Sequence, residues 1–173
     1  MNTTASFCGL LGLVAVLASG ANVRADDPAS TTRVRAQEPE LAELVHEGTD
    51  RSATFRRLVQ RIDETDGIVY IQTGPCSISA VAGCLLMRVT ETEHARYLRI
   101  HVTAHPTRAE QRISILGHEL QHAYEILCRN SVRTTADAYA LFIRIGSARS
   151  IRGFETDEAQ RVEGAIAREL AAR

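Results

Sequence analysis

Two histidines and a glutamate in the segment 117–122 have the spacing of a metal centre carried on one helix. Residues four apart lie about 40° apart around a helix and about 6 Å apart along it. The imidazoles of His118 and His122 can therefore reach one metal ion, and the carboxylate of Glu119 can reach a water molecule on that ion. Two histidines and a carboxylate favour Zn2+ as the ion.

The residues around this HExxH pattern predict a helix with a buried face. Apolar side chains recur every three or four residues over the segment 108–128: Ile113, Leu116, Leu120, Tyr124 and Leu127. Ile115 lies on the same side of that helix as both histidines. The alternative interpretation, two unrelated histidines on a wet surface, therefore fits the pattern poorly.

The HExxH pattern at 118–122 resembles the active-site helix of the zincin metallopeptidases. The predicted order of elements is similar too, with helices, a small sheet, the active-site helix and C-terminal helices. The longer metzincin motif is absent, because Glu125 and Cys128 stand where Gly and His would be. In zincins an edge strand of the sheet beside the active-site helix holds the substrate, and by chain order Tyr97 to Thr103 resembles that strand.

The third metal ligand must be a carboxylate, because no histidine follows His122. The chain resembles gluzincins here, in which a Glu from a downstream helix is the third ligand. Glu155 is the preferred candidate, because it stands 33 residues after His122 and follows the apolar Phe154. Glu155, Asp157 and Glu158 cluster at the predicted start of the last helix, where the ordinary preference for acidic residues at a helix N-terminus explains at least one of them. Glu125, one turn beyond His122, is expected to support the site or lie at the surface. The carboxylates that stay open as alternatives are Glu158, Asp137 and Asp157.

The resemblance implies hydrolysis of a peptide bond in a peptide or protein substrate. In that mechanism Glu119 is the general base, which takes a proton from a zinc-activated water and returns it to the leaving amine. The developing oxyanion needs a second donor besides the metal. The candidates for that donor are His101, His105, Tyr139 and Arg144.

Two other interpretations come from different classes of protein. A non-catalytic secreted zinc-binding or partner-binding module is the first, because cleavage after residue 25 leaves only 148 residues and little second wall for a cleft. The small size also suggests a regulatory partner protein. The second is a carboxylate di-iron helical protein, since segments 43–46 and 119–122 both read Glu-x-x-His. That fold needs four long helices, for which the strand-like stretch 68–102 leaves no room.

The elements that must position the site predict an α+β, zincin-like domain over residues 38–173. Helices are expected from Pro39 and over 52–64 before the sheet, and over 134–145 and from Glu155 after the active-site helix. Between them, three strands predict a roughly three-stranded, mostly antiparallel sheet. A short link makes the last two an antiparallel hairpin. The strand segments are Ile68–Ile71, Leu85–Thr90 and Tyr97–Val102.

The N-terminal part of the chain is predicted to lie outside this domain. Residues 1–25 are expected to be a cleaved signal peptide, because the apolar run 7–21 is too short to cross a bilayer. Residues 26–37 are expected to be a disordered leader. The protein is thus predicted to be secreted or periplasmic, with no stable membrane span after cleavage. In that oxidising compartment Cys76 and Cys84 can form a disulfide, which leaves Cys128 as a thiol expected to be buried at a helix end.

The charge composition argues against two classes of partner. The chain has 20 basic residues, all of them Arg, and 21 acidic residues, for a formal net charge of −1. A balance so close to zero gives no long-range positive field. No nucleic-acid partner and no polybasic membrane contact are therefore expected.

Overall fold

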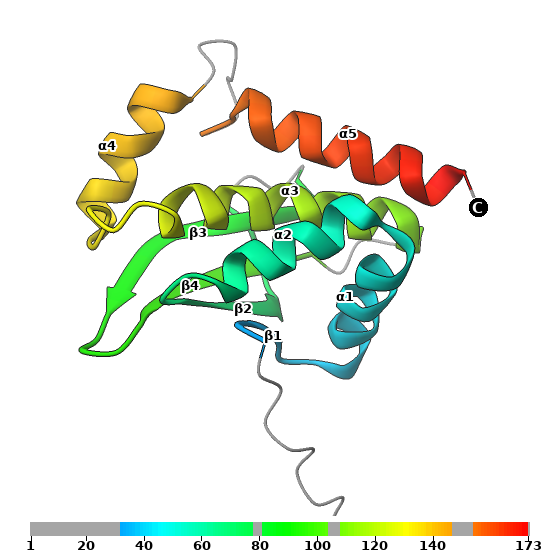
Figure 1. Cartoon of the computed structure of the whole chain (residues 1–173), viewed down its shortest axis with the longest axis horizontal. Coiled ribbons are helices and arrows are strands. Elements are labelled where there is room, and N and C mark those ends of the chain that lie inside the picture. Colours follow the sequence, from blue (N-terminus) through cyan, green and yellow to red (C-terminus); the bar gives the residue numbers. More distant parts are fainter. Residues whose placement is uncertain (1–31, 78–80, 104–107, 147–153, 173) are drawn as a thin grey trace, which may run out of the picture. The chain divides into compact units, whose positions relative to one another are not determined.

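The computed structural model describes residues 32–77, 81–103, 108–146 and 154–172. Within these ranges helices precede and follow a sheet, which confirms the α+β class (Figure 1). In chain order the elements are β1 (Val34–Ala36), α1 (Pro39–Arg51), α2 (Ala53–Asp63), β2 (Gly67–Thr73), β3 (Gly83–Glu91), β4 (Arg96–Val102), α3 (Ala109–Leu127), α4 (Thr135–Ile145) and α5 (Asp157–Ala171).

The described sheet has four strands in the order β1-β2-β4-β3. β3 and β4 form the expected antiparallel hairpin, whereas β2 pairs in parallel with both β1 and β4. The prediction of a three-stranded, mostly antiparallel sheet is therefore wrong in strand number and in direction. The physical reason is that parallel neighbours need a crossover connection, and α1 and α2 supply it between β1 and β2.

The strand β1 lies in the segment 26–37 that the sequence predicted to be a disordered leader. Val34 is buried and pairs with Val69 of β2. The carboxylate of Asp63 also accepts a hydrogen bond from the backbone N–H of Arg33 at 2.6 Å. The described part of that segment, residues 32–37, thus belongs to the fold. The predicted signal peptide, residues 1–25, lies outside the described residues.

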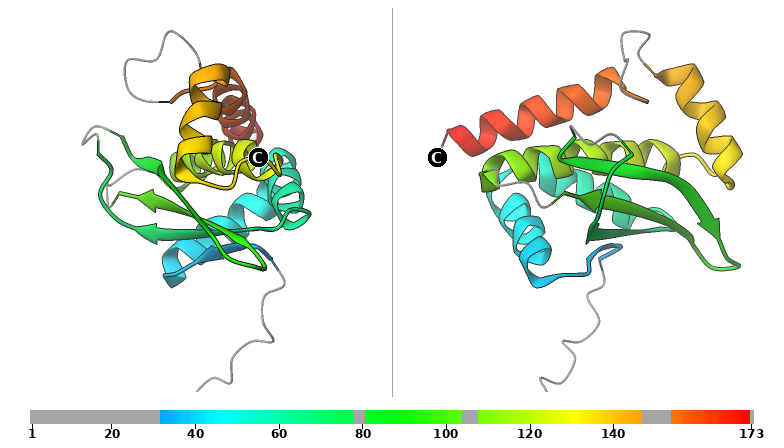
Figure 2. Two further views of the ribbon diagram at one scale, coloured as in Figure 1. Left: turned by 90° about the vertical axis from the view of Figure 1, so that its left-hand side faces the viewer. Right: turned by 180° about the vertical axis from the view of Figure 1, so that it is seen from behind.

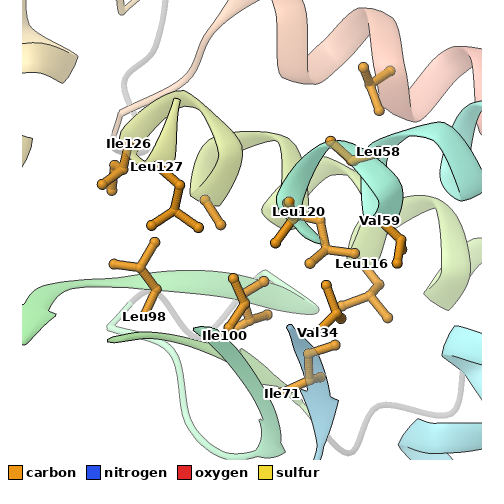
Figure 3. Packing of buried hydrophobic residues seen from close by; sticks show 14 of the residues in the cluster. Val34, Leu58, Val59, Ile71, Leu98, Ile100, Leu116, Leu120, Ile126 and Leu127 are labelled. Atoms are coloured by element: carbon orange, nitrogen blue, oxygen red, sulfur yellow. The ribbon is translucent and has the colours of Figure 1, made fainter. Parts of the chain in front are cut away.

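Apolar side chains fill the space between one face of the sheet and the helices α2 and α3 (Figure 3). β4 buries alternate residues, as its apolar and polar alternation predicted, and these meet Leu116, Leu120 and Ile126 of α3 across the core. α5 packs against α3 on the side away from the sheet (Figure 2). α3 is therefore the central helix, which explains why so much of it is buried.

Arg96 fastens the C-terminal end of α3 to the sheet. Its side chain is 0% exposed, and its guanidinium bonds to the carboxylate of Asp66, the residue before β2. A cation at a helix C-terminus satisfies carbonyls that have no partner within the helix and opposes the helix dipole. The backbone carbonyls that accept from Arg96 belong to Ile126, Leu127, Arg129 and Val132.

The cysteines follow the sequence analysis in part. Cys76 and Cys84 form a disulfide between β2 and β3, which hints at an oxidising, extracellular setting. Cys128 is exposed, so the prediction that it is buried is wrong. The reason is that α3 ends at the buried Leu127, and Cys128 is the C-cap residue after it, outside the buried part of the helix. None of the helices in the described part of the chain has the length and apolarity that a bilayer crossing requires.

Candidate metal centre

Two histidines of α3 and one glutamate before α5 direct their side chains at a common point. The Nε2 atoms of His118 and His122 lie 3.1 Å apart. The Oε1 atom of Glu155 lies 3.2 Å from Nε2 of His118 and 3.8 Å from Nε2 of His122. These three residues form a group that could hold a metal ion.

The hydrogen-bond partners of the two imidazoles favour a tautomer that suits a cation at this place. Nδ1 of His118 lies 2.9 Å from a carboxylate oxygen of Glu163, and Nδ1 of His122 lies 3.1 Å from one of Glu125. A carboxylate accepts hydrogen bonds, so in the neutral rings the protons lie on Nδ1 and both Nε2 atoms present lone pairs. Together with the oxygen of Glu155, three electron-pair donors then face one another, an arrangement that a cation stabilises.

The distances between the three donor atoms suit zinc. Two ligands that lie 2.0–2.1 Å from a tetrahedral zinc ion are about 3.3 Å apart. The separations of 3.1, 3.2 and 3.8 Å bracket that value. The carboxylates on Nδ1 also match the partners that orient metal-bound histidines in general. The residues present therefore fit a zinc ion, although the donor set alone does not fix its identity.

Glu119 lies beside this group and is buried. Its Oε2 atom accepts a hydrogen bond of 2.6 Å from the backbone N–H of Leu85 in β3. Burial raises the pKa of the Glu119 carboxyl above its ordinary value, and the two histidines and the Leu85 N–H oppose that shift only in part.

The pKa values of the supporting groups follow from the same network. Burial alone would lower the pKa of His118, but the hydrogen bond to Glu163 and the nearby negative charges outweigh it and raise the pKa. Burial alone would raise the pKa of Glu125, but hydrogen bonds from His122, Thr156 and Gln121 lower it. Glu125 thus carries a negative charge directly behind the ring of His122.

A cleft of about 620 Å³ opens beside the histidines between β3, α3, α4 and the start of the α5 segment. β3 is the edge strand at this cleft, whereas β4 lies between β2 and β3. The prediction that residues 97–103 form the edge strand is therefore wrong. The hairpin places the later strand inside the sheet, an order that the sequence of elements cannot reveal. One end of the cleft is aromatic, with Tyr139, Phe142 and Phe154.

The other carboxylates predicted as third ligands are engaged elsewhere or exposed. Glu158 pairs with Arg161. Asp137 caps the start of α4, where it accepts from the backbone N–H of Thr134 at 2.9 Å. Asp157 is exposed on the first turn of α5. Among the described residues, Glu155 is the candidate that meets both histidines, with Oε1 3.2 Å from Nε2 of His118 and 3.8 Å from Nε2 of His122.

The predicted oxyanion donors lie in different places. Tyr139 lines the cleft, and its ring packs against Phe154. His101 does not line the cleft, because its Nδ1 lies 2.8 Å from the carbonyl oxygen of Pro75. Arg144 is exposed on α4 away from the cleft lining. His105 lies outside the described residues.

The sequence analysis missed two groups at the site. Glu163 reaches His118 from α5, and Thr156 holds Glu125. The buried face of α5, at Ala159, Val162 and Ile166, was readable from its periodicity. Glu163 follows that face by one residue, a signal that could have placed it near α3.

Comparison of this chain with protein-family models, with curated proteins and with solved structures gave no match in any of the three. The site is therefore described from its own geometry. What the described residues show is a group of two histidines and one glutamate that could hold a metal ion, with carboxylates behind both imidazoles.

Proposed function

We propose that this chain is a zinc-dependent peptidase with His118, His122 and Glu155 as metal ligands. The observation that carries the proposal is the convergence of these three donors beside the buried Glu119 in an open cleft. Structural zinc sites take four protein ligands, whereas catalytic sites take three and keep one position open. The three-donor group of the described residues favours the catalytic kind over a non-catalytic zinc module.

Different residues of the chain have different roles in the proposed hydrolysis. A bound zinc ion supplies Lewis acidity and lowers the pKa of water toward about 7. Glu119 takes a proton from the attacking water and delivers it to the nitrogen of the leaving amine. The Leu85 N–H bond holds that carboxylate in place beside the metal ligands. Tyr139 is the donor candidate that lines the cleft and is proposed to stabilise the oxyanion.

The substrate is proposed to be a peptide in extended form along β3. An edge strand presents unpaired backbone N–H and C=O groups, to which a peptide can add as a further strand. The N–H of Leu85 donates to Glu119, so this edge of β3 faces the site. The N–H of Val89 donates to the hydroxyl of Thr135, so a peptide would pair with the other backbone groups of this edge. Gly83 lets β3 lie close to α3, because a Cβ there would lie 2.8 Å from Cγ2 of Ile115 in α3.

The protein is further proposed to be secreted or periplasmic and to have a regulatory partner protein. The Cys76–Cys84 disulfide supports an oxidising compartment. The signal peptide at 1–25 stays a prediction from the sequence. A partner would add a second wall to the cleft of so small a domain.

Replacing Glu119 by Gln tests the proposed mechanism. Hydrolysis of a peptide library is expected to fall roughly 10²- to 10⁴-fold, because the general base is lost, while zinc stays bound. Glu110→Gln, on the same helix but distant from the histidines, is the control that keeps activity. Full activity of Glu119→Gln with zinc bound would contradict the mechanism. Zinc binding without hydrolysis in the wild type would favour the non-catalytic module.

A further inference from the structure

The carboxylate of Glu125 connects the two segments that supply the metal ligands. Its side chain is only 8% exposed. One oxygen lies 3.1 Å from Nδ1 of His122, and the other accepts from the hydroxyl of Thr156 at 2.8 Å. Gln121 donates to that second oxygen at 3.5 Å. One buried group thus contacts both a histidine of α3 and a residue 31 positions further along the chain.

Thr156 also caps the start of α5 and binds the side chain of the residue before it. It is 3% exposed and is the N-cap of α5, where its hydroxyl accepts from the backbone N–H of Ala159 at 3.1 Å. Its own backbone N–H donates to Oε1 of Glu155 at 3.2 Å. That oxygen is the one directed at His118 and His122. The hydroxyl, with one proton and two lone pairs, serves as cap and as donor at the same time.

We propose that Glu125 and Thr156 are positioning residues, which hold Glu155 in place as the third metal ligand. This inference rests on the metal site proposed above. The helix α3 supplies two ligands without help, because its own geometry fixes their spacing. Glu155 has no helix to fix it, so its position depends on the Thr156 hydroxyl and Glu125. Metal binding in turn is expected to stabilise the first turn of α5.

Substitutions at position 156 separate capping from positioning. Asp caps a helix at least as well as Thr, so Thr156→Asp keeps the start of α5. It also places a second carboxylate against Glu125, which removes the hydroxyl bond and repels the charge. Thr156→Ser keeps both the cap and the hydroxyl. Thr134→Ala at the N-cap of α4 is the control that weakens a cap away from Glu125.

Zinc affinity is measured by competition with a chelator, and stability by thermal unfolding of the metal-free proteins. We expect Thr156→Asp and Glu125→Gln to bind zinc roughly 10- to 100-fold more weakly than the wild type. Thr156→Ser should bind like the wild type, and Thr134→Ala should lose stability but keep its zinc affinity. Wild-type affinity in Thr156→Asp would overturn the proposal.

Hydrogen exchange of the wild type gives a second measurement that needs no variant. The amides of Ala159 and Gln160, which donate to the hydroxyl and carbonyl oxygens of Thr156, should exchange more slowly when zinc is added, because the metal holds Glu155 and thereby Thr156. Equal exchange with and without zinc, in a protein that binds zinc, would contradict the positioning role of Thr156 but leave the metal site intact. A wild type that binds no zinc would instead overturn the metal site itself.

Discussion

Glycine at position 117 lets α3 approach α5, and replacing it by alanine tests how tightly these helices pack beside His118. A Cβ at 117 would lie 2.1 Å from Cδ1 of Ile166 and 3.5 Å from Cδ2 of Phe55. Ile166 is completely buried, so its terminal methyl must shift within the core to make room for the new Cβ. Such overpacking costs about 1–3 kcal/mol, and alanine regains about 1 kcal/mol through helix propensity. We expect Gly117→Ala to lower the free energy of unfolding by roughly 1 kcal/mol.

A double-mutant cycle makes this prediction sharper. Ile166→Val removes the Cδ1 atom and alone should cost about 0.5–1.5 kcal/mol. In the double variant the new Cβ fills the space that the methyl leaves, so the two losses should not add. We expect a favourable coupling energy of about 1–2 kcal/mol from urea unfolding followed by circular dichroism. Additivity of Gly117→Ala and Ile166→Val within about 0.5 kcal/mol would refute the packing argument.

Two further predictions concern the ends of the strands. The hydrogen bond from Arg96 lowers the pKa of Asp66, so the stabilisation by this pair is complete above about pH 4 and is lost as the pH falls through the folded-state pKa. Urea unfolding should therefore separate Asp66→Asn from the wild type at pH 7, and the gap should narrow as the pH is lowered from about 4. A gap that does not narrow at any acidic pH at which the protein still folds would contradict the assignment. Reduction of the Cys76–Cys84 disulfide, whose cysteines are eight residues apart, should lower the free energy of unfolding by about 2–3 kcal/mol, with Cys128→Ser as an unaffected control. An unchanged urea midpoint after reduction would be inconsistent with that estimate.

The parts of the fold that depend on neighbouring residues could be predicted from the sequence. Helices expected over 52–64 and 108–128 are observed as Ala53–Asp63 and Ala109–Leu127, because their apolar residues repeat at helical spacing. The antiparallel hairpin followed from the short link between two strand-like segments. The approach of the two histidines belongs to the same class of feature, since helix geometry alone sets it.

The parts that depend on distant contacts could not be predicted in this way. β1 has three residues, too few for a periodic signal, and it is part of the sheet only because it pairs with β2. The position of β4 inside the sheet likewise depends on its pairing with β2. Glu155 was preferred as the third ligand from its position in the sequence, but three other carboxylates stayed open because no local pattern decides which one meets the histidines. The packing of α5 on α3 brings Glu155 to the histidines and Glu163 behind His118.

Zinc stoichiometry of the purified protein and two matched variants tests the central claim most directly. Glu155 and Glu158 lie three residues apart, but only Glu155 faces the histidines. After incubation with zinc and removal of excess, we expect about one zinc per chain in the wild type and in Glu158→Ala, and strongly reduced binding in Glu155→Ala. Less than about 0.2 zinc per chain in the wild type, or full retention in Glu155→Ala, would contradict the proposed centre.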